Sequence, residues 1–299
     1  MSDRASISNI IKLSIPIFFA NLVIPLVAIV DTGLMGNLDN ASYLTATSIA
    51  TSVFSLIFWS FGFLRMGTVG LVAQAHGSNQ YEEIVNLVFQ NIAFVIIISL
   101  LLVIFQKYIF TIALSIFDLS NETSKYFKEY FEIRIYSSFG ELIIFIITGL
   151  FIGLQRTTIS SVVVGFFSIT NIVLSLIFVI SFDLDVRGVA LGTVISSTLT
   201  AIIFLCYTFF ELKKFTSIKI NIAKIFNLKK IKKLFNINLD IFIRSALLTF
   251  SFIFFTYLGN TISEDVVAAN TILLNLIMLS AFILDAYAFS TEGIVGYSI

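Results

Sequence analysis

The first long apolar stretch of the sequence, Ile10–Met35, limits the fold most strongly, and it contains a single carboxylate, Asp31. About 20 apolar residues are enough to cross the hydrocarbon core of a bilayer. An acid inside such a segment costs roughly 2.5 kcal/mol or more unless it faces a cavity or a partner. We therefore expect Asp31 to bind a proton or a cation. The alternative is a structural role as hydrogen-bond acceptor for Thr32 or a neighbouring helix.

Further apolar stretches of similar length follow along the chain, in which 58% of residues are hydrophobic and only 12% are charged. A soluble domain has a much smaller apolar fraction. The stretches lack strand-like alternation, and open strands cannot be satisfied in lipid, so we predict an all-α polytopic membrane protein. The predicted spans are Ile10–Met35, Ala46–Ala73, Ile84–Phe110, Tyr130–Leu154, Ser160–Phe182, Val189–Phe210, Leu239–Leu258 and Val266–Ser290.

The distribution of lysine and arginine predicts the orientation of these spans. With a cytoplasmic N-terminus, the inside segments hold Arg4, Lys12, Arg156 and the lysine-rich stretch 213–235. The positive-inside rule favours this orientation, which predicts a multi-pass protein of the plasma (inner) membrane. Residues 213–235 are interpreted either as an amphipathic helix at an anionic headgroup surface or as a solvated linker. The formal net charge of zero indicates no nucleic-acid partner, and the sequence leaves the oligomeric state open.

Two short patterns recur within the chain. Gly36-Asn37 returns as Gly259-Asn260, and Thr68–Val72 resembles Thr291–Val295, each pair separated by 223 residues. A common offset is typical of a duplicated unit, here of six helices. It predicts a first lobe at 1–212, a basic cytoplasmic connector at 213–235 and a partial second lobe at 236–299. A complete repeat has a length of roughly 450 residues, so we expect a C-terminally truncated chain.

The segment Phe61–Gly77 reads FGFLRMGTVGLVAQAHG and resembles the second-helix signature of the multidrug and toxic compound extrusion (MATE) transporters, in particular their DinF-like branch. This family belongs to the MOP superfamily. Similar pieces occur in order along essentially the whole chain. They are Pro16 with Val30–Thr32, Ile133–Ile135, Gly149–Gln155, Asn171–Leu174, Gly188–Thr193 and Leu284–Gly296.

The resemblance implies two six-helix lobes around a central cavity, in a secondary-active exporter that works by alternating access. It implies exchange of a small organic compound, cationic or amphipathic, for protons or sodium ions, with no other cofactor. The acid of the family's first helix corresponds to Asp31, and polar partners correspond to Asn171 and Thr193. We expect these three residues to converge.

One position departs from the family pattern, because Ser175 stands where many relatives have an aspartate. Two acids that share a site help one of them to hold a proton near neutral pH, and this chain lacks the second acid. Glu141, on the fourth span, is a possible substitute. The alternatives for Glu141 are an ion pair with Arg134 or extension toward the outer interface.

Three further residues are assigned from sequence context. Pro25 removes a backbone hydrogen bond in the first span and is interpreted either as a hinge or as a fixed kink. Asp285 and Glu292 are seven residues apart on one helix, so they lie near one face as cavity-lining acids that attract cations.

The chain has too few residues of the kinds that catalysis and metal binding need. His76 is the only histidine and Cys206 the only cysteine, and the sequence contains no Gly-rich phosphate-binding lysine loop. We therefore predict no metal site and no enzymatic activity. Two alternatives to an exporter remain, a lipid-linked precursor flippase of the same superfamily and a non-transporting truncated remnant. The flippase predicts a strongly basic cavity, whereas the lysines here gather in one loop.

Overall fold

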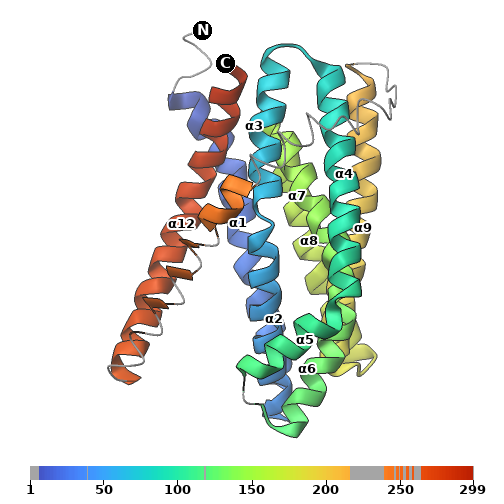
Figure 1. Cartoon of the computed structure of the whole chain (residues 1–299), viewed down its shortest axis with the longest axis vertical. Helices are drawn as coiled ribbons and strands as arrows, with labels where there is room; N and C mark the ends of the chain where they lie inside the picture. The colour runs from blue at the N-terminus through green and yellow to red at the C-terminus, as the bar shows by residue number, and fades with distance from the viewer. Residues whose placement is uncertain are drawn as a thin grey trace.

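A computed structural model describes residues 7–38, 40–117, 119–215, 239–245 and 264–298, with a few isolated positions between 247 and 258. In the last range, side chains are described from residue 273 onward, except at 275, 278 and 279. The described residues form a bundle of helices (Figure 1). The helices are α1 (Ile7–Gly36), α2 (Ala41–Ser60), α3 (Phe63–Gly77), α4 (Tyr81–Ile104), α5 (Gln106–Ile116), α6 (Asn121–Arg134), η1 (Ile135–Ser137), α7 (Ser138–Gly153), α8 (Thr157–Leu176), η2 (Ile177–Ser181), α9 (Asp185–Lys213) and α12 (Glu264–Ser298).

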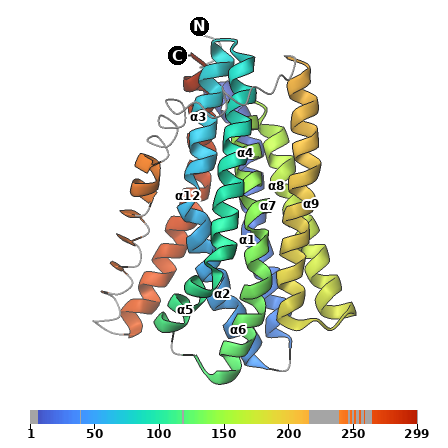
Figure 2. The same cartoon turned by 45° about the vertical axis from the view of Figure 1, so that its right-hand side comes forward.

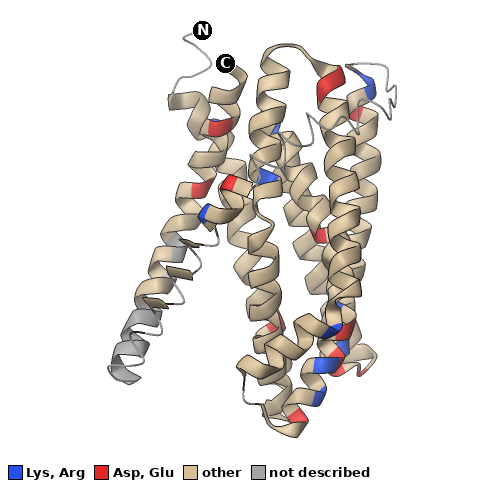
Figure 3. Ribbon diagram, in the orientation of Figure 1, with Lys and Arg blue, Asp and Glu red and all other residues tan. Residues whose placement is uncertain are grey.

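Six helical segments of the described chain are long and apolar enough to cross a membrane, and they confirm the first six predicted spans. Charged residues gather most densely at the end of the bundle that holds α5 and α6, and long stretches of the helices between the two ends carry none (Figure 3). This distribution is expected of helices that cross a hydrocarbon layer. The six segments are Ile7–Gly36, Ala41–Gly77, Tyr81–Ile104, Asn121–Gly153, Thr157–Ser181 and Asp185–Lys213.

Two predicted boundaries were wrong. The third span ends at Ile104 instead of Phe110, and α5 follows it as a separate short helix that crosses the end of the bundle (Figures 1 and 2). The prediction extended the span because residues 106–116 are mostly apolar, although Gln106 and Lys107 introduce polar groups at the break. The fourth span begins at Asn121, earlier than Tyr130, because Ser120 caps α6 by accepting a hydrogen bond from the backbone of Thr123 (3.2 Å).

The predicted seventh span, Leu239–Leu258, is described only in part, and residues 239–245 of it are helical. Most of the predicted connector, from residue 216 onward, lies outside the described residues. The lobe boundaries at 212 and 235 therefore stay predictions. The eighth span corresponds to α12, which extends beyond both predicted ends, Val266 and Ser290.

Close packing between helices depends on glycines at four-residue spacing. A Cβ atom at Gly149 would lie 2.6 Å from the carbonyl oxygen of Arg65, and one at Gly153 would lie 2.8 Å from that of Val69. These distances show that the backbones of α3 and α7 are nearly in contact. On α9, a Cβ atom at Gly192 would lie 2.7 Å from Ser175 Oγ on α8. Small residues at four-residue spacing are typical of helix faces that approach closely in membranes.

Helix α12 packs against α1 and α3, in the second half of its length. Ser14 and Ser290 share a hydrogen bond between hydroxyl oxygens 2.7 Å apart, and Asn21 Nδ2 donates to the carbonyl of Phe282 (3.3 Å). On α3, Gly70 is close to Glu292 and Gly77 is close to Tyr297, so α3 and α12 run parallel. The two segments that share a sequence pattern, one in each helix, therefore lie side by side.

Candidate functional site

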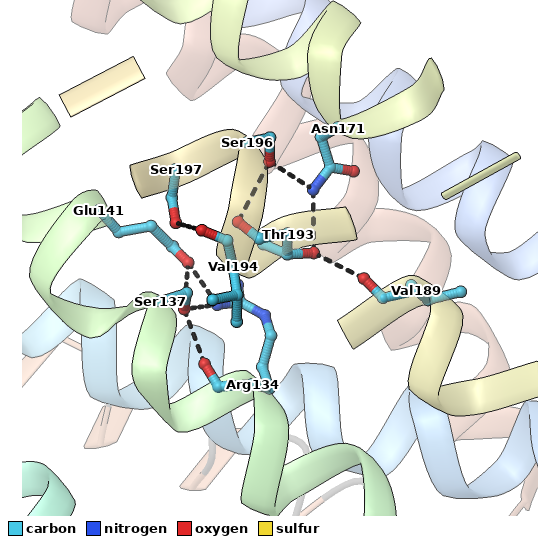
Figure 4. Close-up of polar contacts among 9 residues, drawn as sticks. All are labelled: Arg134, Ser137, Glu141, Asn171, Val189, Thr193, Val194, Ser196 and Ser197. Carbon is cyan, nitrogen blue, oxygen red and sulfur yellow. Dashed lines mark hydrogen bonds and ion pairs between the residues drawn. The ribbon is translucent and has the colours of Figure 1, made fainter. Parts of the chain in front are cut away.

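A buried polar group joins α8 to α9 in the interior of the bundle (Figure 4). Asn171 Nδ2 donates to Thr193 Oγ1 at 2.9 Å, and Ser196 Oγ lies 3.4 Å from the same nitrogen. The hydroxyl groups of Thr193 and Ser196 donate in turn to backbone carbonyls of α9. All three residues are buried, with Asn171 only 1% exposed. The hydrogen bonds that its NH2 group donates thus hold the Asn171 amide in one orientation.

The carbonyl end of the same amide has no hydrogen-bond partner. Asn171 Oδ1 is buried and unpartnered, and so are Ser175 Oγ, one helical turn further along α8, and Asp31 Oδ1 on α1. The Asp31 carboxylate lies next to the Ser175 side chain and in the electrostatic field of Arg134. Buried polar atoms usually have partners, so these buried oxygens need an explanation.

A second polar group, on α6 and α7, borders the first. Arg134 forms an ion pair with Glu141, and Ser137 donates to the Glu141 carboxylate at 2.9 Å (Figure 4). The Arg134 guanidinium also lies above the rings of Phe54 and Phe58, 5.2 and 5.4 Å from their centroids. The charge of Glu141 is therefore already balanced by Arg134.

The structure brings together two of the predicted site residues directly, Asn171 and Thr193, and places Asp31 beside Ser175 on the same face of α8. Glu141 forms the ion pair with Arg134 that was one of the predicted alternatives to a coupling role. Sequence reasoning did not assign Ser175 itself to the site, although its position one turn after Asn171 in an apolar helix was the available signal.

Asp285 and Glu292 lie on α12, away from this group. Both carboxylates interact electrostatically with Arg65 of α3 and with Arg244 in the helical segment 239–245. The Arg65 guanidinium stacks over the ring of Phe289, with its central carbon 3.8 Å from the ring centroid. Neither Arg65 nor Phe289 was predicted as a site residue. The signal for Phe289 was its spacing, four residues after Asp285 and three before Glu292.

Pro25 lies inside α1, which continues through it without interruption from Ile7 to Gly36. Because proline has no backbone N–H, the carbonyl of Asn21 loses its usual helical partner. The Asn21 side chain makes the contact with α12 described above. The choice between a hinge and a fixed kink at Pro25 stays a prediction.

The sequence profile of the MatE family matches residues 16–177, more than half of the chain. The chain belongs to the MatE family. It is 31% identical over 255 residues to the DNA damage-inducible protein F of Escherichia coli K12, a match that covers 85% of this chain and 55% of the relative. This match confirms the predicted likeness to the DinF-like branch of the MATE family.

Two other similarities agree with this assignment. The multidrug export protein MepA of Staphylococcus aureus strain bovine RF122 / ET3-1 is 24% identical over 242 residues, covering 80% of this chain and 52% of MepA. A crystal structure of MATE in the bent conformation superposes with a TM-score of 0.86 at 20% identity. The match covers 97% of this chain and 64% of the chain in that structure. This MatE chain thus spans about half the length of the curated relatives that it matches, and it has the MATE fold of a multi-pass membrane protein.

Proposed function

We propose that this MatE chain is part of a secondary-active exporter of small organic compounds, in which a proton or a sodium ion binds at Asp31. The observation that carries the proposal is the set of unpartnered buried oxygens, Asp31 Oδ1, Ser175 Oγ and Asn171 Oδ1. The similarity to MepA, a multidrug export protein, supports the exporter part of the proposal.

An orphaned oxygen is costly in a low-dielectric interior, and a carboxylate oxygen is the most costly of the three. A bound proton gives Asp31 a neutral O–H group that can donate to a neighbouring oxygen. A sodium ion instead accepts all three oxygens as ligands, since hard cations prefer oxygen donors. Either ion offsets the cost of burying the Asp31 carboxylate. Occupancy of the ion site and the local packing of α1 against α8 therefore depend on each other.

The charge balance around Asp31 also favours a monovalent ion. Arg134 acts electrostatically on Asp31, and the ion pair between Arg134 and Glu141 already compensates the charge of the arginine. Asp31 is then left with about one uncompensated negative charge. Exchange follows when the organic substrate and the ion favour different arrangements of the lobes, because only differential binding shifts such an equilibrium.

The test is efflux of ethidium from cells that express the complete reading frame, with proton and sodium gradients imposed separately. We expect gradient-driven efflux from the wild type and its loss in Asp31→Asn, which keeps the shape of the side chain and removes its charge. Glu132→Gln is the matched control, because Glu132 is exposed and pairs only with Lys128 on the surface of α6.

Efflux that Asp31→Asn leaves unchanged would remove Asp31 as the coupling site and move attention to Glu141 or to the acids of α12. Efflux from the wild type that depends on one gradient alone identifies the ion. A wild type that exports no organic cation under either gradient contradicts the proposed function and favours a non-transporting remnant.

A further inference from the structure

Helix α12 presents an aromatic ring between two acids on one face. Phe289 follows Asp285 by four residues and precedes Glu292 by three, so the three side chains are neighbours on the helix surface. Asp285 is exposed and Glu292 is half-buried, whereas Phe289 is 9% exposed. An aromatic face flanked by carboxylates is the arrangement that proteins use to bind organic cations.

In this structure a cation already lies on that face, and it comes from another helix. The Arg65 guanidinium is 3.8 Å from the Phe289 ring centroid and interacts electrostatically with Asp285 and Glu292. Its Nε atom is buried without a hydrogen-bond partner. Within the described residues, no carboxylate oxygen forms an ion pair with Arg65. The arginine is therefore held by the ring face and by charge at longer range, without the paired hydrogen bonds that usually fix a guanidinium.

The charges at this interface are matched in number. Arg65 and Arg244 act on the two carboxylates, and Arg244 lies close by, with Nη2 3.6 Å from Met66 Sδ. If Arg65 moved away, the two acids with Arg244 would carry a net charge of about −1. A planar monovalent cation would restore the balance and could stack on the ring that Arg65 leaves.

We propose that Asp285, Phe289 and Glu292 form a binding site for planar organic monocations, and that Arg65 occupies this site as an internal competitor when α3 and α12 are in contact. The inference rests on the proposed function and adds to it the class of substrate and the residues that hold it. Arg65 is then a specificity-determining residue, because a substrate must displace it.

The packing of α3 against α12 on the C-terminal side of Arg65 makes this competition a conformational one. A Cβ atom at Gly70 would lie 3.4 Å from Glu292 Oε1, and one at Gly296 would lie 2.8 Å from the Cβ atom of Ala73. At these distances no aromatic ligand fits between α3 and α12. A cation can stack on the Phe289 ring only after Arg65 leaves it, so cation binding favours the state in which α3 and α12 separate, by the difference in affinity.

The test is equilibrium binding of ethidium, followed by fluorescence, to the protein purified from its complete reading frame. We expect Arg65→Gln to bind ethidium about tenfold more tightly than the wild type, since a desolvated cation–π contact is lost from the competing state. Arg65→Lys, which keeps a charge but cannot stack as a plane, should fall between them. Arg187→Gln is the control, because Arg187 pairs with Glu129 on the surface, at a distance from α12.

A second pair of variants keeps the inference testable if Arg65→Gln folds poorly. Phe289→Leu and Glu292→Gln remove the ring and one acid of the site itself, and each should weaken ethidium binding several-fold in the presence of Arg65. Combining Phe289→Leu with Arg65→Gln should abolish the gain expected from Arg65→Gln alone.

Ethidium binding that is unchanged or weaker in Arg65→Gln overturns the competition, and binding that is unaffected by Phe289→Leu and Glu292→Gln overturns the site. Both results are distinct from failure of the proposed function. If the proposed function fails, the wild type neither binds nor exports ethidium. If only this inference fails, the wild type does both, and only the response to these variants differs from the expected one.

Discussion

The side-chain amide of Asn171 donates to Thr193 Oγ1 at 2.9 Å, and the carbonyl oxygen of the same amide is buried without a hydrogen-bond partner. The orientation of an amide is set by the partners of its NH2 group. Thr193 therefore acts on the candidate ion site through Asn171. Its own hydroxyl is held by the backbone carbonyl of Val189 at 3.1 Å.

Replacement of Thr193 by valine should destabilise the protein. Valine keeps the volume but removes the acceptor, so the buried Asn171 NH2 group retains only Ser196, at 3.4 Å. We expect a loss of about 1–3 kcal/mol, measured by thermal unfolding in detergent, and recovery in Thr193→Ser. Thr45→Val is the control, because the hydroxyl of Thr45 is bonded only to its own helix at an exposed position. Equal losses in both valine variants would contradict a specific role for Thr193.

Replacement of Ser175 by alanine should weaken a sodium site. Ser175 Oγ is one of the three available oxygens, and a missing ligand worth about 1.4 kcal/mol raises the half-saturating ion concentration about tenfold. The measurement is the sodium dependence of ethidium efflux. Ser161→Ala on the same helix serves as control, since its hydroxyl is bonded to the backbone of Thr157. An unchanged sodium dependence would exclude Ser175 as a ligand, and efflux that sodium never drives would assign the site to protons.

Replacement of Gly153 by alanine should separate α3 from α7. The new methyl group would lie 2.8 Å from the Val69 carbonyl oxygen and 2.9 Å from Val72, and both are fixed parts of the neighbouring helix. We expect a loss of about 1–3 kcal/mol in thermal unfolding. Gly165→Ala is a matched control in the middle of α8, where nothing lies within 4 Å of the new atom. That variant should be neutral or slightly stabilised, because alanine is the better helix former.

The helical membrane fold could be predicted from the sequence because it depends on the length and composition of apolar stretches, which are local properties. The spacing of the glycine pairs is also a local property, since residues four apart lie on one helix face. The break between α4 and α5 was missed, because residues 106–116 are mostly apolar apart from Gln106 and Lys107, and hydropathy does not detect a change of helix direction.

The site was predictable only in part. Asp31, Asn171 and Thr193 were assigned by resemblance, and their helices do meet. The state of Glu141 depends on whether Arg134 can reach it across the short helix η1, and seven residues of spacing allowed that pair without requiring it. The contact between Arg65 and Phe289 joins helices more than 200 residues apart in sequence, so neither periodicity nor composition could indicate it.

The orientation in the membrane can be tested with single cysteines in a Cys206→Ser background. Ser78 lies at the exposed end of α3 and Asn121 at the exposed start of α6, so both positions accept a reagent. The distribution of lysine and arginine predicts that Ser78 faces the cytoplasm and Asn121 the outside. In intact cells, a membrane-impermeant maleimide should therefore label Asn121→Cys at once and label Ser78→Cys only after permeabilisation. The reverse pattern would place the N-terminus outside, and with it the basic connector, against the charge rule from which the orientation was inferred.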